Sequence, residues 1–272
     1  MDQLIAAYLD NSRGQWSDCL LSSYAYLRHS WKSKWIGLPT LLKSCATFLN
    51  LLPGDVIDTS NLLNAAIAIA LQIEDEKGCG IDTEEPSYHN RLHFADSLTT
   101  ITLQCGLEIR NGAKNDKAWL AAMLLIALCH DFRHPGRVNQ HTSEIESNTV
   151  NFLRPILISK EVSPLWIDRL SEIILRSDFS LVKQNHSRVK DRSFQWETEW
   201  ATVLLNEADI MASASRTFGL MNSQALSMEW QAVNFPAYST VATPEGRRQF
   251  LSSIQFTSYS ARVLSSNILE SI

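Results

Sequence analysis

A strongly apolar segment of the chain, Ala118–Cys129, ends abruptly in two ionisable residues, His130 and Asp131. Its length and composition predict a buried helix of about four turns, and Pro135-Gly136 would stop it just beyond the pair. Burying an imidazole and a carboxylate beside an apolar helix is costly unless the two groups are hydrogen-bonded or bound to a metal. The segment therefore predicts a helical core with either a metal site or a hydrogen-bonded histidine–aspartate pair at one end.

A second pair of ionisable residues, His89 and His93, lies earlier in the chain. Residues four apart lie on one helix face, with about 5–6 Å between their Cβ atoms. Two imidazoles at that distance can divide the work, one binding a metal and the other moving a proton. An isolated pair of this kind is usually only a polar helix face, but four of the seven histidines fall within 88–93 and 130–136. Together the two runs indicate a metal site.

A metal site needs at least one more protein ligand, and Asp209 is a candidate. It interrupts the apolar segment 200–212 where the hydrophobic stripe should continue, so we expect it to face inward while Glu207 faces elsewhere. Asp178 interrupts a similar apolar run. A single aspartate in a helix is usually solvated or a cap, so each gains weight only beside the histidine runs.

The composition of the chain excludes several classes of partner. Its 272 residues suffice for one large helical domain or two small ones. A net charge of −5 without a long basic run argues against nucleic-acid binding. No apolar stretch reaches the roughly 18 residues of a membrane span, and the first residues lack the basic start of a signal peptide. Five cysteines without Cys-x-x-Cys spacing indicate reduced thiols, so we expect a cytoplasmic protein with no membrane or nucleic-acid partner.

Hydrophobic residues recur with a helical period through most of the chain, and no segment alternates as a strand would. The expected fold is all-α, a compact bundle of many helices around a central cup for the metal. Helices are predicted at 2–10, 15–29, 38–50, 60–77, 88–109, 116–131, 142–158, 163–176, 196–219, 220–232 and 245–270. Loops are predicted at 78–87, 111–112, 179–193 and 234–244. The third loop is polar and basic, and is either a lid over the site or a solvated connector.

Four short motifs follow one another in a fixed order along the chain. They are Tyr88-His89-Asn90-x-x-His93, His130-Asp131-x-x-His134-Pro135-Gly136-x-x-Asn139, Ile174-Leu175-x-Ser177-Asp178 and Ala208-Asp209, and Phe250-Leu251 echoes a fifth. In this order they resemble the catalytic domain of the class I cyclic nucleotide phosphodiesterases, which are HD-type metallophosphohydrolases. The resemblance covers residues 85–256. It implies that 1–84 supplies helices packed on a catalytic core, 85–272, within one continuous domain.

The resemblance implies a role for each matching residue. The residues that would bind the tighter metal are His93, His130, Asp131 and Asp209. Asp131 would also bridge to a second metal, and His89 would donate a proton to the leaving 3′ oxygen. The residues that would surround these ligands, and contact the metals through water or through the ligands, are His134, Glu146 and Asp178. The aromatic residues that would contact the substrate are Tyr88 and Phe250, the latter by stacking on the base.

The expected cofactors are two divalent metal ions. Two imidazoles and two carboxylates make a mixed nitrogen–oxygen donor set, which suits Zn, Fe, Ni, Co or Mn. The second position would have few protein ligands and suits Mg or Mn. Two such ions can activate a bridging water and clamp the phosphoryl oxygens, so no side-chain nucleophile is required. The expected reaction is hydrolysis of a cyclic nucleotide, or a related nucleotidic phosphodiester, by a metal-bridging hydroxide with His89 as general acid.

Two positions depart from the family pattern where the substrate would bind. Arg133 stands where the family has an acidic residue, and either favours a more anionic substrate or caps a helix. Arg247 stands where the family has the glutamine that reads the base, and Gln249 would lie on a different helix face. Arginine can pair with guanine or with an extra phosphate, but it has no acceptor for an adenine amino group. The alternative is that Arg247 is only a solvated basic residue.

Two questions stay open at this level, the function and the role of the N-terminal aromatic residues. A phosphomonoesterase acting on a nucleotide would use the same metal site, and a nucleotide-binding pseudoenzyme is a third function, although the complete ligand set and His89 argue against it. The expected partner in each case is a small-molecule nucleotide. The aromatic residues of the first 80 positions either pack on the later helices or form the face of a homodimer, because aromatic side chains anchor interfaces.

Overall fold

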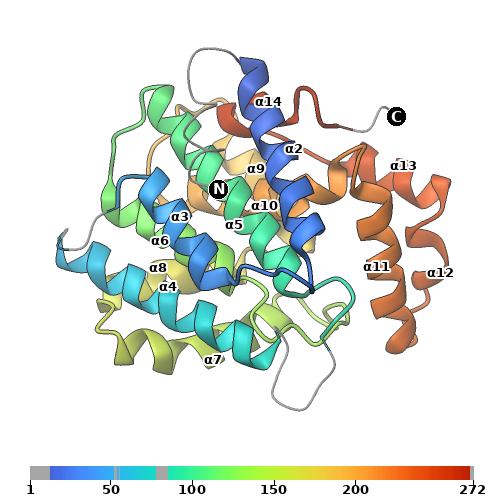
Figure 1. The fold of residues 1–272 in the computed structure, drawn as a ribbon, viewed down its shortest axis with the longest axis horizontal. Coiled ribbons are helices and arrows are strands. Elements are labelled where there is room, and N and C mark those ends of the chain that lie inside the picture. Colours follow the sequence, from blue (N-terminus) through green and yellow to red (C-terminus); the bar gives the residue numbers. More distant parts are fainter. Residues whose placement is uncertain (1–12, 52–53, 55, 78–84, 270–272) are drawn as a thin grey trace.

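The computed structural model describes residues 13–51, 54, 56–77 and 85–269, which form helices joined by short connections (Figure 1). The α-helices are α2 (Arg13–Ser30), α3 (Leu38–Phe48), α4 (Ile57–Glu76), α5 (Arg91–Arg110), α6 (Lys117–Cys129), α7 (Glu144–Ser159), α8 (Pro164–Leu175), α9 (Val182–Val189), α10 (Thr198–Ala214), α11 (Gly219–Ala232), α12 (Tyr238–Val241), α13 (Pro244–Ser253) and α14 (Tyr259–Ser265). A short 3-10 helix, η1 (Phe179–Leu181), precedes α9. This part of the chain contains no strand, only an isolated bridge between Ser215 and Leu269. The all-α prediction is confirmed.

The centre of the fold is built from α5 and α6. Every residue of α6 from Trp119 to Cys129 is buried, as its uniformly apolar sequence predicts for a helix surrounded by other helices. The helices α4 and α8 pack on α6, and α10 contacts both α5 and α6. Because α5, α6 and α10 contact one another, polar residues on their facing sides are forced into one space.

The N-terminal helices pack directly on this centre. The helix α2 contacts α5 and α14, α3 contacts α4, α5 and α6, and α4 contacts α6 and α7. Two aromatic residues of the N-terminal region, Trp16 and Tyr24, are buried in these contacts. Both residues therefore belong to the core and do not form a dimer face. Within the described residues, no helix combines the length and the apolar character that crossing a bilayer requires.

The segment 179–193 was predicted to be a loop or a lid, and this prediction is wrong. It contains η1 and α9, and Asp178 begins η1 by accepting a hydrogen bond from the N–H of Ser180 at 2.8 Å. The buried residues of α9 are Asn185, His186 and Val189, and the helix packs on α10. Because two of the three buried side chains are polar, the helical period was not visible in the apolar residues.

The helix predicted at 245–270 is broken into α13 and α14 by the residues 254–258. Glu207 holds this break, because its carboxylate accepts hydrogen bonds from the backbone N–H groups of Thr257 and Ser258 and from the Ser258 hydroxyl. Ser258 in turn caps α14 by accepting a hydrogen bond from the N–H of Ala261 at 3.0 Å. A buried carboxylate from a distant helix sets the break, so local periodicity could not reveal it.

Three further predictions of local structure differ from the fold or lie wholly or mostly outside the described residues. The predicted loop 234–244 contains the short helix α12. The predicted helix 2–10 and most of the predicted loop 78–87 lie outside the described residues. The other predicted helices match observed ones, with ends that shift by a few residues.

Candidate metal centre

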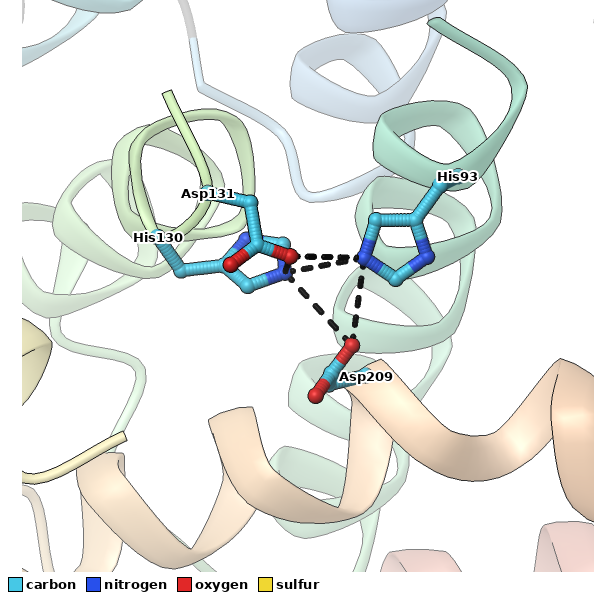
Figure 2. A group of neighbouring side chains, drawn as sticks. All are labelled: His93, His130, Asp131 and Asp209. Atoms are coloured by element: carbon cyan, nitrogen blue, oxygen red, sulfur yellow. Dashed lines mark hydrogen bonds and ion pairs between the residues drawn. The ribbon is translucent and has the colours of Figure 1, made fainter. Parts of the chain in front are cut away.

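Four side chains from three parts of the chain meet at the centre of the fold (Figure 2). His93 lies in the first turn of α5, His130 and Asp131 directly follow α6, and Asp209 lies on α10. One potential ligand atom from each residue lies within 4.8 Å of those of the other three. These are the four residues that the family resemblance assigned to the tighter metal, brought together by helices that are far apart in the sequence.

The potential ligand atoms are spaced like the ligands of a single ion. Nε2 of His93 lies 3.3 Å from Nε2 of His130 and 3.0 Å from Oδ2 of Asp131. Oδ1 of Asp209 lies 3.2 Å from Nε2 of His93 and 3.6 Å from Nε2 of His130. Donor atoms bound at about 2.0–2.2 Å to one metal are about 2.8–3.6 Å apart in octahedral or tetrahedral geometry. These four atoms can therefore share one divalent ion.

Local structure directs the two imidazoles toward each other. The side chain of Asn90 caps α5 by accepting hydrogen bonds from the N–H groups of Leu92 at 2.9 Å and His93 at 3.2 Å, which starts the helix in the register that turns His93 inward. Nδ1 of His130 lies 3.1 Å from the carbonyl oxygen of Ala127, which accepts its hydrogen bond. His130 therefore carries a proton on Nδ1 and offers Nε2 as a ligand.

The imidazoles of this cluster are buried, whereas the carboxylates are partly open to solvent. The side chains of Asp131 and Asp209 are 18% and 35% exposed. Burial alone would lower the pKa of both histidines, but the charges and hydrogen bonds of the two aspartates raise it, to about 9 for His93 and about 10 for His130. The same contacts hold the pKa of each aspartate well below its usual range, although burial acts to raise it.

The donor set fits a divalent metal. It consists of two imidazole nitrogens and two carboxylate oxygens, and such a mixed set accommodates Zn, Fe, Ni, Co or Mn. A metal would take the place of the protons that the histidines and aspartates otherwise share. Because the carboxylate side is partly exposed, coordination positions remain for water or a substrate.

A second group of potential ligands adjoins the first and shares Asp131. The side chains of His89, Asp131 and His134 also place ligand atoms within 4.8 Å of one another. The rings of His89 and His134 are stacked, with centroids 3.7 Å apart, and Nδ1 of His134 accepts a hydrogen bond from the N–H of Gly136 at 3.1 Å. Burial and the neighbouring His89 lower the pKa of His134 to about 3, so this imidazole is neutral at pH 7.

The side chain of His89 is held by a residue that sequence reasoning missed, Glu229 of α11. The carboxylate accepts hydrogen bonds from Nδ1 of His89 and from the backbone N–H groups of Tyr88 at 2.8 Å and His89 at 3.0 Å. Burial acts to raise the pKa of Glu229, but these contacts outweigh it and lower the pKa to about 2. The ionised carboxylate can only accept, so Nδ1 of His89 carries a proton and Nε2 faces Asp131, whose Oδ2 lies 3.9 Å away.

One signal in the sequence could have drawn attention to Glu229. It is the only charged residue between Arg216 and Glu245, and only 6% of it is exposed in the fold. A carboxylate is rarely buried without a partner. The sequence does not show which partner it has, because His89 is 140 residues away.

The aromatic residue next to His89, Tyr88, contacts the histidines and α10. Its ring lies against His93 with centroids 5.0 Å apart, and its hydroxyl is 3.0 Å from Oγ of Ser213. Burial and the charge of Asp209 raise the pKa of Tyr88 above its usual range, so its hydroxyl stays protonated. These contacts place Tyr88 against the potential metal ligands, and its contact with the substrate stays a prediction.

The predicted outer residues Glu146 and Asp178 hold the loop that follows His134. Both oxygens of Glu146 accept hydrogen bonds from Nδ2 of Asn139, at 2.9 and 3.2 Å. Asp178 accepts from the backbone N–H of Ser143 at 2.6 Å, which fixes the start of α7. Burial raises the pKa of Glu146, and the charges of Asp178 and Asp131 act in the same direction. Both residues lie outside the two groups of potential ligands.

Arg133 was predicted either to favour a more anionic substrate or to cap a helix, and the structure shows it engaged by Glu76 instead. Its Nε and Nη2 donate to both oxygens of Glu76 on α4, at 2.8 and 2.6 Å. The guanidinium also lies 4.9 Å from the ring centroid of Phe152 on α7. Arg133 therefore joins the end of α6 to α4 and α7, and its donors are directed at Glu76.

The structure also corrects the expectation that Arg247 reads a base. Arg247 is 3% exposed, and its Nη1 donates to the carbonyl oxygen of Ser213 at 2.9 Å and to Oγ of Ser223 at 3.0 Å. It joins α13 to α10 and α11, so it is neither solvated nor directed at a ligand. On the same helix, Gln249 is exposed and Phe250 is half-buried. The family resemblance matched Arg247 to the base-reading glutamine, but the sequence did not show which partners hold its side chain.

Comparisons with known proteins support the fold. No protein-family model matches the chain, and no curated protein matches it by sequence. Its fold is similar to that of LmjPDEB1 in complex with IBMX, with a TM-score of 0.59 and 14% identity over 97% of this chain and 90% of that one. It is also similar to the phosphodiesterase domain of the RhoPDE fusion protein from the choanoflagellate Salpingoeca rosetta, with a TM-score of 0.52 and 16% identity over 88% of this chain and 77% of that one. The chain therefore has the all-α fold of these phosphodiesterase domains.

Proposed function

We propose that this protein is a metal-dependent phosphodiesterase that hydrolyses a cyclic nucleotide or a related nucleotidic phosphodiester. The observation that carries the proposal is the convergence of two imidazoles and two carboxylates at spacings suited to one ion, beside a third imidazole with its own carboxylate partner. The fold supports it, because LmjPDEB1 and the RhoPDE domain have the same all-α arrangement.

The chain offers positions for two ions. The residues proposed to hold the first, which would be Zn, Fe, Ni, Co or Mn, are His93, His130, Asp131 and Asp209. The second, Mg or Mn, would lie near the group that shares Asp131 with His89 and His134, mostly held by water. Bound divalent ions supply Lewis acidity to the phosphoryl oxygens and lower the pKa of water.

The proton for the leaving oxygen would come from Nε2 of His89. This nitrogen faces the ligand groups, because Nδ1 is engaged by Glu229. Water oxygen would bond to phosphorus as the bond from phosphorus to the 3′ oxygen breaks, and that oxygen would take the proton to become the 3′ hydroxyl of the nucleoside monophosphate. A general acid of this kind contributes about 10²–10⁴-fold to the rate. Stacking on His134 restricts rotation of the ring, so Nε2 stays directed at the site.

A second candidate, a phosphomonoesterase acting on a nucleotide, would use the same metal site, and one observation removes a feature expected of a purine-reading phosphodiesterase. Arg247 occupies the position at which the class I family reads the base, and it is buried against Ser213 and Ser223. That position thus offers no amide to a purine. Phe250, half-buried on the same helix, would still stack on any base and would contribute affinity without selectivity.

Turnover on a panel of substrates tests the proposal. The protein, loaded with Mn²⁺ or Zn²⁺, would be assayed on cyclic AMP, cyclic GMP, a cyclic dinucleotide and 5′-nucleotides. Conversion of a cyclic substrate to a monophosphate, abolished by a chelator and restored by metal, is the expected result. Phosphate release from 5′-nucleotides alone would favour the second candidate. Metal binding without turnover of any substrate would make the protein a pseudoenzyme and contradict the proposal.

A further inference from the structure

The N-terminal helix α2 reaches the site through one buried arginine, Arg28. Its Nη1 and Nη2 donate to Oδ1 and Oδ2 of Asp96 at 2.9 and 2.7 Å. The two side chains are 10% and 4% exposed, so the ion pair is withdrawn from water. Asp96 lies on α5, three residues after His93. Arg28 therefore fixes α2 to the helix that presents a proposed metal ligand.

The same guanidinium also contacts α11. Nη2 of Arg28 lies 3.3 Å from Oδ1 of Asn222, which accepts its hydrogen bond, and the guanidinium lies 4.3 Å from the ring centroid of Phe218. Phe218 is the residue directly before α11. Asn222 donates in turn to Oγ of Ser213 on α10 at 3.2 Å. The first turn of α11 is thus held to α2, α5 and α10 by polar and cation–π contacts.

These contacts matter because α11 has almost no apolar anchor. Its buried residues are Gly219, Ser223 and Glu229. Large apolar side chains of the same helix, such as Leu220, Met221 and Met228, are exposed. Most helices in proteins are held in place by an apolar face, and that face is small in α11, where Leu226 and Trp230 are only half-buried. Polar links must therefore set how α11 lies against the site.

The position of α11 in turn sets the position of Glu229. Glu229 lies seven residues after Asn222, which is about two turns or 10 Å along the helix. It holds Nδ1 of His89 and the two backbone N–H groups that precede α5. A shift at the Asn222 end would move Glu229 relative to His89, because the helix transmits it as a rigid body.

We propose that Arg28 is a positioning residue for His89. By joining Asp96 on α5 to Asn222 on α11 it fixes the position of α11 relative to α5, and so it keeps the carboxylate of Glu229 on His89. The kinetic consequence rests on the proposed function, whereas the structural consequence does not. The N-terminal region, whose sequence carries no functional motif, thereby contributes to the geometry of the site.

Hydrogen–deuterium exchange of the metal-loaded protein tests the structural consequence. In Arg28→Met, the amides of 86–92 and of α11 should exchange about tenfold faster or more, because their positions depend on the lost link. The amides of α6 should be unaffected. In Arg28→Lys these amides should exchange at rates between those of the wild type and of Arg28→Met, because a lysine keeps the charge but cannot form the two-point pair. The matched control is Arg176→Met, which removes an arginine of similar exposure, 12%, from the end of α8.

Kinetics on two substrates test the functional consequence. With a cyclic nucleotide, kcat of Arg28→Met should fall about tenfold or more, because small displacements of a catalytic group are costly. With a nitrophenyl ester, whose leaving group needs no proton, the fall should be less than about twofold. Metal content should not change. In a Glu229→Gln background, Arg28→Met should add little, because both changes act on His89 through one link.

The outcomes separate this inference from the proposed function. Unchanged exchange at 86–92 and α11 in folded Arg28→Met overturns the inference, whatever the activity. Equal slowing on both substrates together with loss of metal also overturns it, since Arg28 would then support the fold as a whole. Faster exchange in a protein that hydrolyses no nucleotide sustains the inference and refutes the proposed function. If Arg28→Met does not fold, Asn222→Ala breaks the same link from α11 and gives the same readouts.

Discussion

The cluster of potential metal ligands and the helix α11 lie on two sides of His89. Different kinds of contact hold these two regions in place. The cluster sits between α5, α6 and α10, and all of α6 from Trp119 to Cys129 is buried apolar packing. The helix α11 buries only Gly219, Ser223 and Glu229. Apolar packing thus positions the potential metal ligands, whereas hydrogen bonds and ion pairs position the proposed proton donor. We therefore expect activity to depend on the chemical identity of the side chains in the cluster of potential metal ligands. Around α11 we expect it to depend on the position that the polar contacts give to His89.

The largest expected effect comes from changing Asp209, one of the potential ligands that apolar packing holds in place. Asp209→Asn removes an anionic ligand while leaving the buried histidines in place, so metal occupancy should fall. Activity should fall by on the order of 10³-fold or more, since a metal supplies several kcal/mol of transition-state stabilisation. Adding metal should raise the Tm of the wild type, and this rise should be absent in the variant. Elemental analysis and thermal unfolding would check this, with the exposed Asp168→Asn as the control. Full metal occupancy in Asp209→Asn would remove Asp209 from the ligand set.

A somewhat smaller effect is expected from changing His89, which the polar contacts of α11 hold in place. His89→Asn should retain the first metal but lose about 10²–10⁴-fold in kcat on a cyclic nucleotide. The loss should shrink on a nitrophenyl ester, because that leaving group departs without a proton. The exposed His141→Asn serves as control. An equal loss on both substrates would show that His89 is not the proton donor.

A change at Arg247 should alter stability and leave base selectivity unchanged. Arg247→Met leaves the carbonyl of Ser213 and the hydroxyl of Ser223 without their donor, so stability should fall by about 1–3 kcal/mol. The ratio of kcat/KM for cyclic AMP and cyclic GMP should change less than about twofold. Urea unfolding and steady-state kinetics would measure both, with Arg248→Met, 58% exposed, as the control. A tenfold change in the ratio at unchanged stability would mean that Arg247 faces the base after all.

The last expected effect, which is absent at neutral pH, is the pH dependence of stability from His186, which lies on α9. Burial lowers the pKa of His186 to about 4, and its Nδ1 lies 2.7 Å from Oγ1 of Thr257. The unfolded chain takes up a proton near pH ~6.5 and the folded protein does not, so stability is full above that pH. As the pH falls from about 6.5 to about 4, up to about 3 kcal/mol should be lost.

Comparing His186→Asn with wild type isolates this contribution. Urea midpoints at pH 7.5 and pH 4.5 should show a smaller acid loss in the variant, because it has no buried imidazole to protonate. Glu207, the other titratable group bonded to Thr257, is present in both proteins and cancels in the difference. The exposed His29→Asn removes an imidazole that is not buried, as a control. An acid loss of equal size in His186→Asn would assign the effect elsewhere.

The same contrast explains what could be predicted from the sequence. His130 and Asp131 end a segment of otherwise apolar residues, and Asp209 interrupts another, so the conflict with their neighbours is visible locally. That conflict, together with the two histidine runs, indicated a metal site, and the family resemblance implied which four residues would form it. Helical periodicity predicted the all-α fold. Both signals arise on helices whose positions are set by burial of apolar surface.

The polar links around α11 could not be predicted in this way. Glu229 is conspicuous as a lone charge, but its partner is reached only through the tertiary fold. The partners of Arg247 are a backbone carbonyl and a serine hydroxyl, which no sequence pattern marks. The same holds for α9, whose buried face includes Asn185 and His186. Where polar contacts decide a position, spacing along the chain does not identify the partners.

The central claim is that four side chains from α5, α10 and the end of α6 bind one divalent ion. Anomalous scattering from crystals grown with Mn²⁺ tests it most directly. We expect an anomalous peak bounded by Nε2 of His93, Nε2 of His130 and the carboxylates of Asp131 and Asp209, and no such peak in Asp209→Asn. Cyclic nucleotide hydrolysis by a wild-type protein whose crystals, at saturating Mn²⁺, show no peak between these four residues would contradict it.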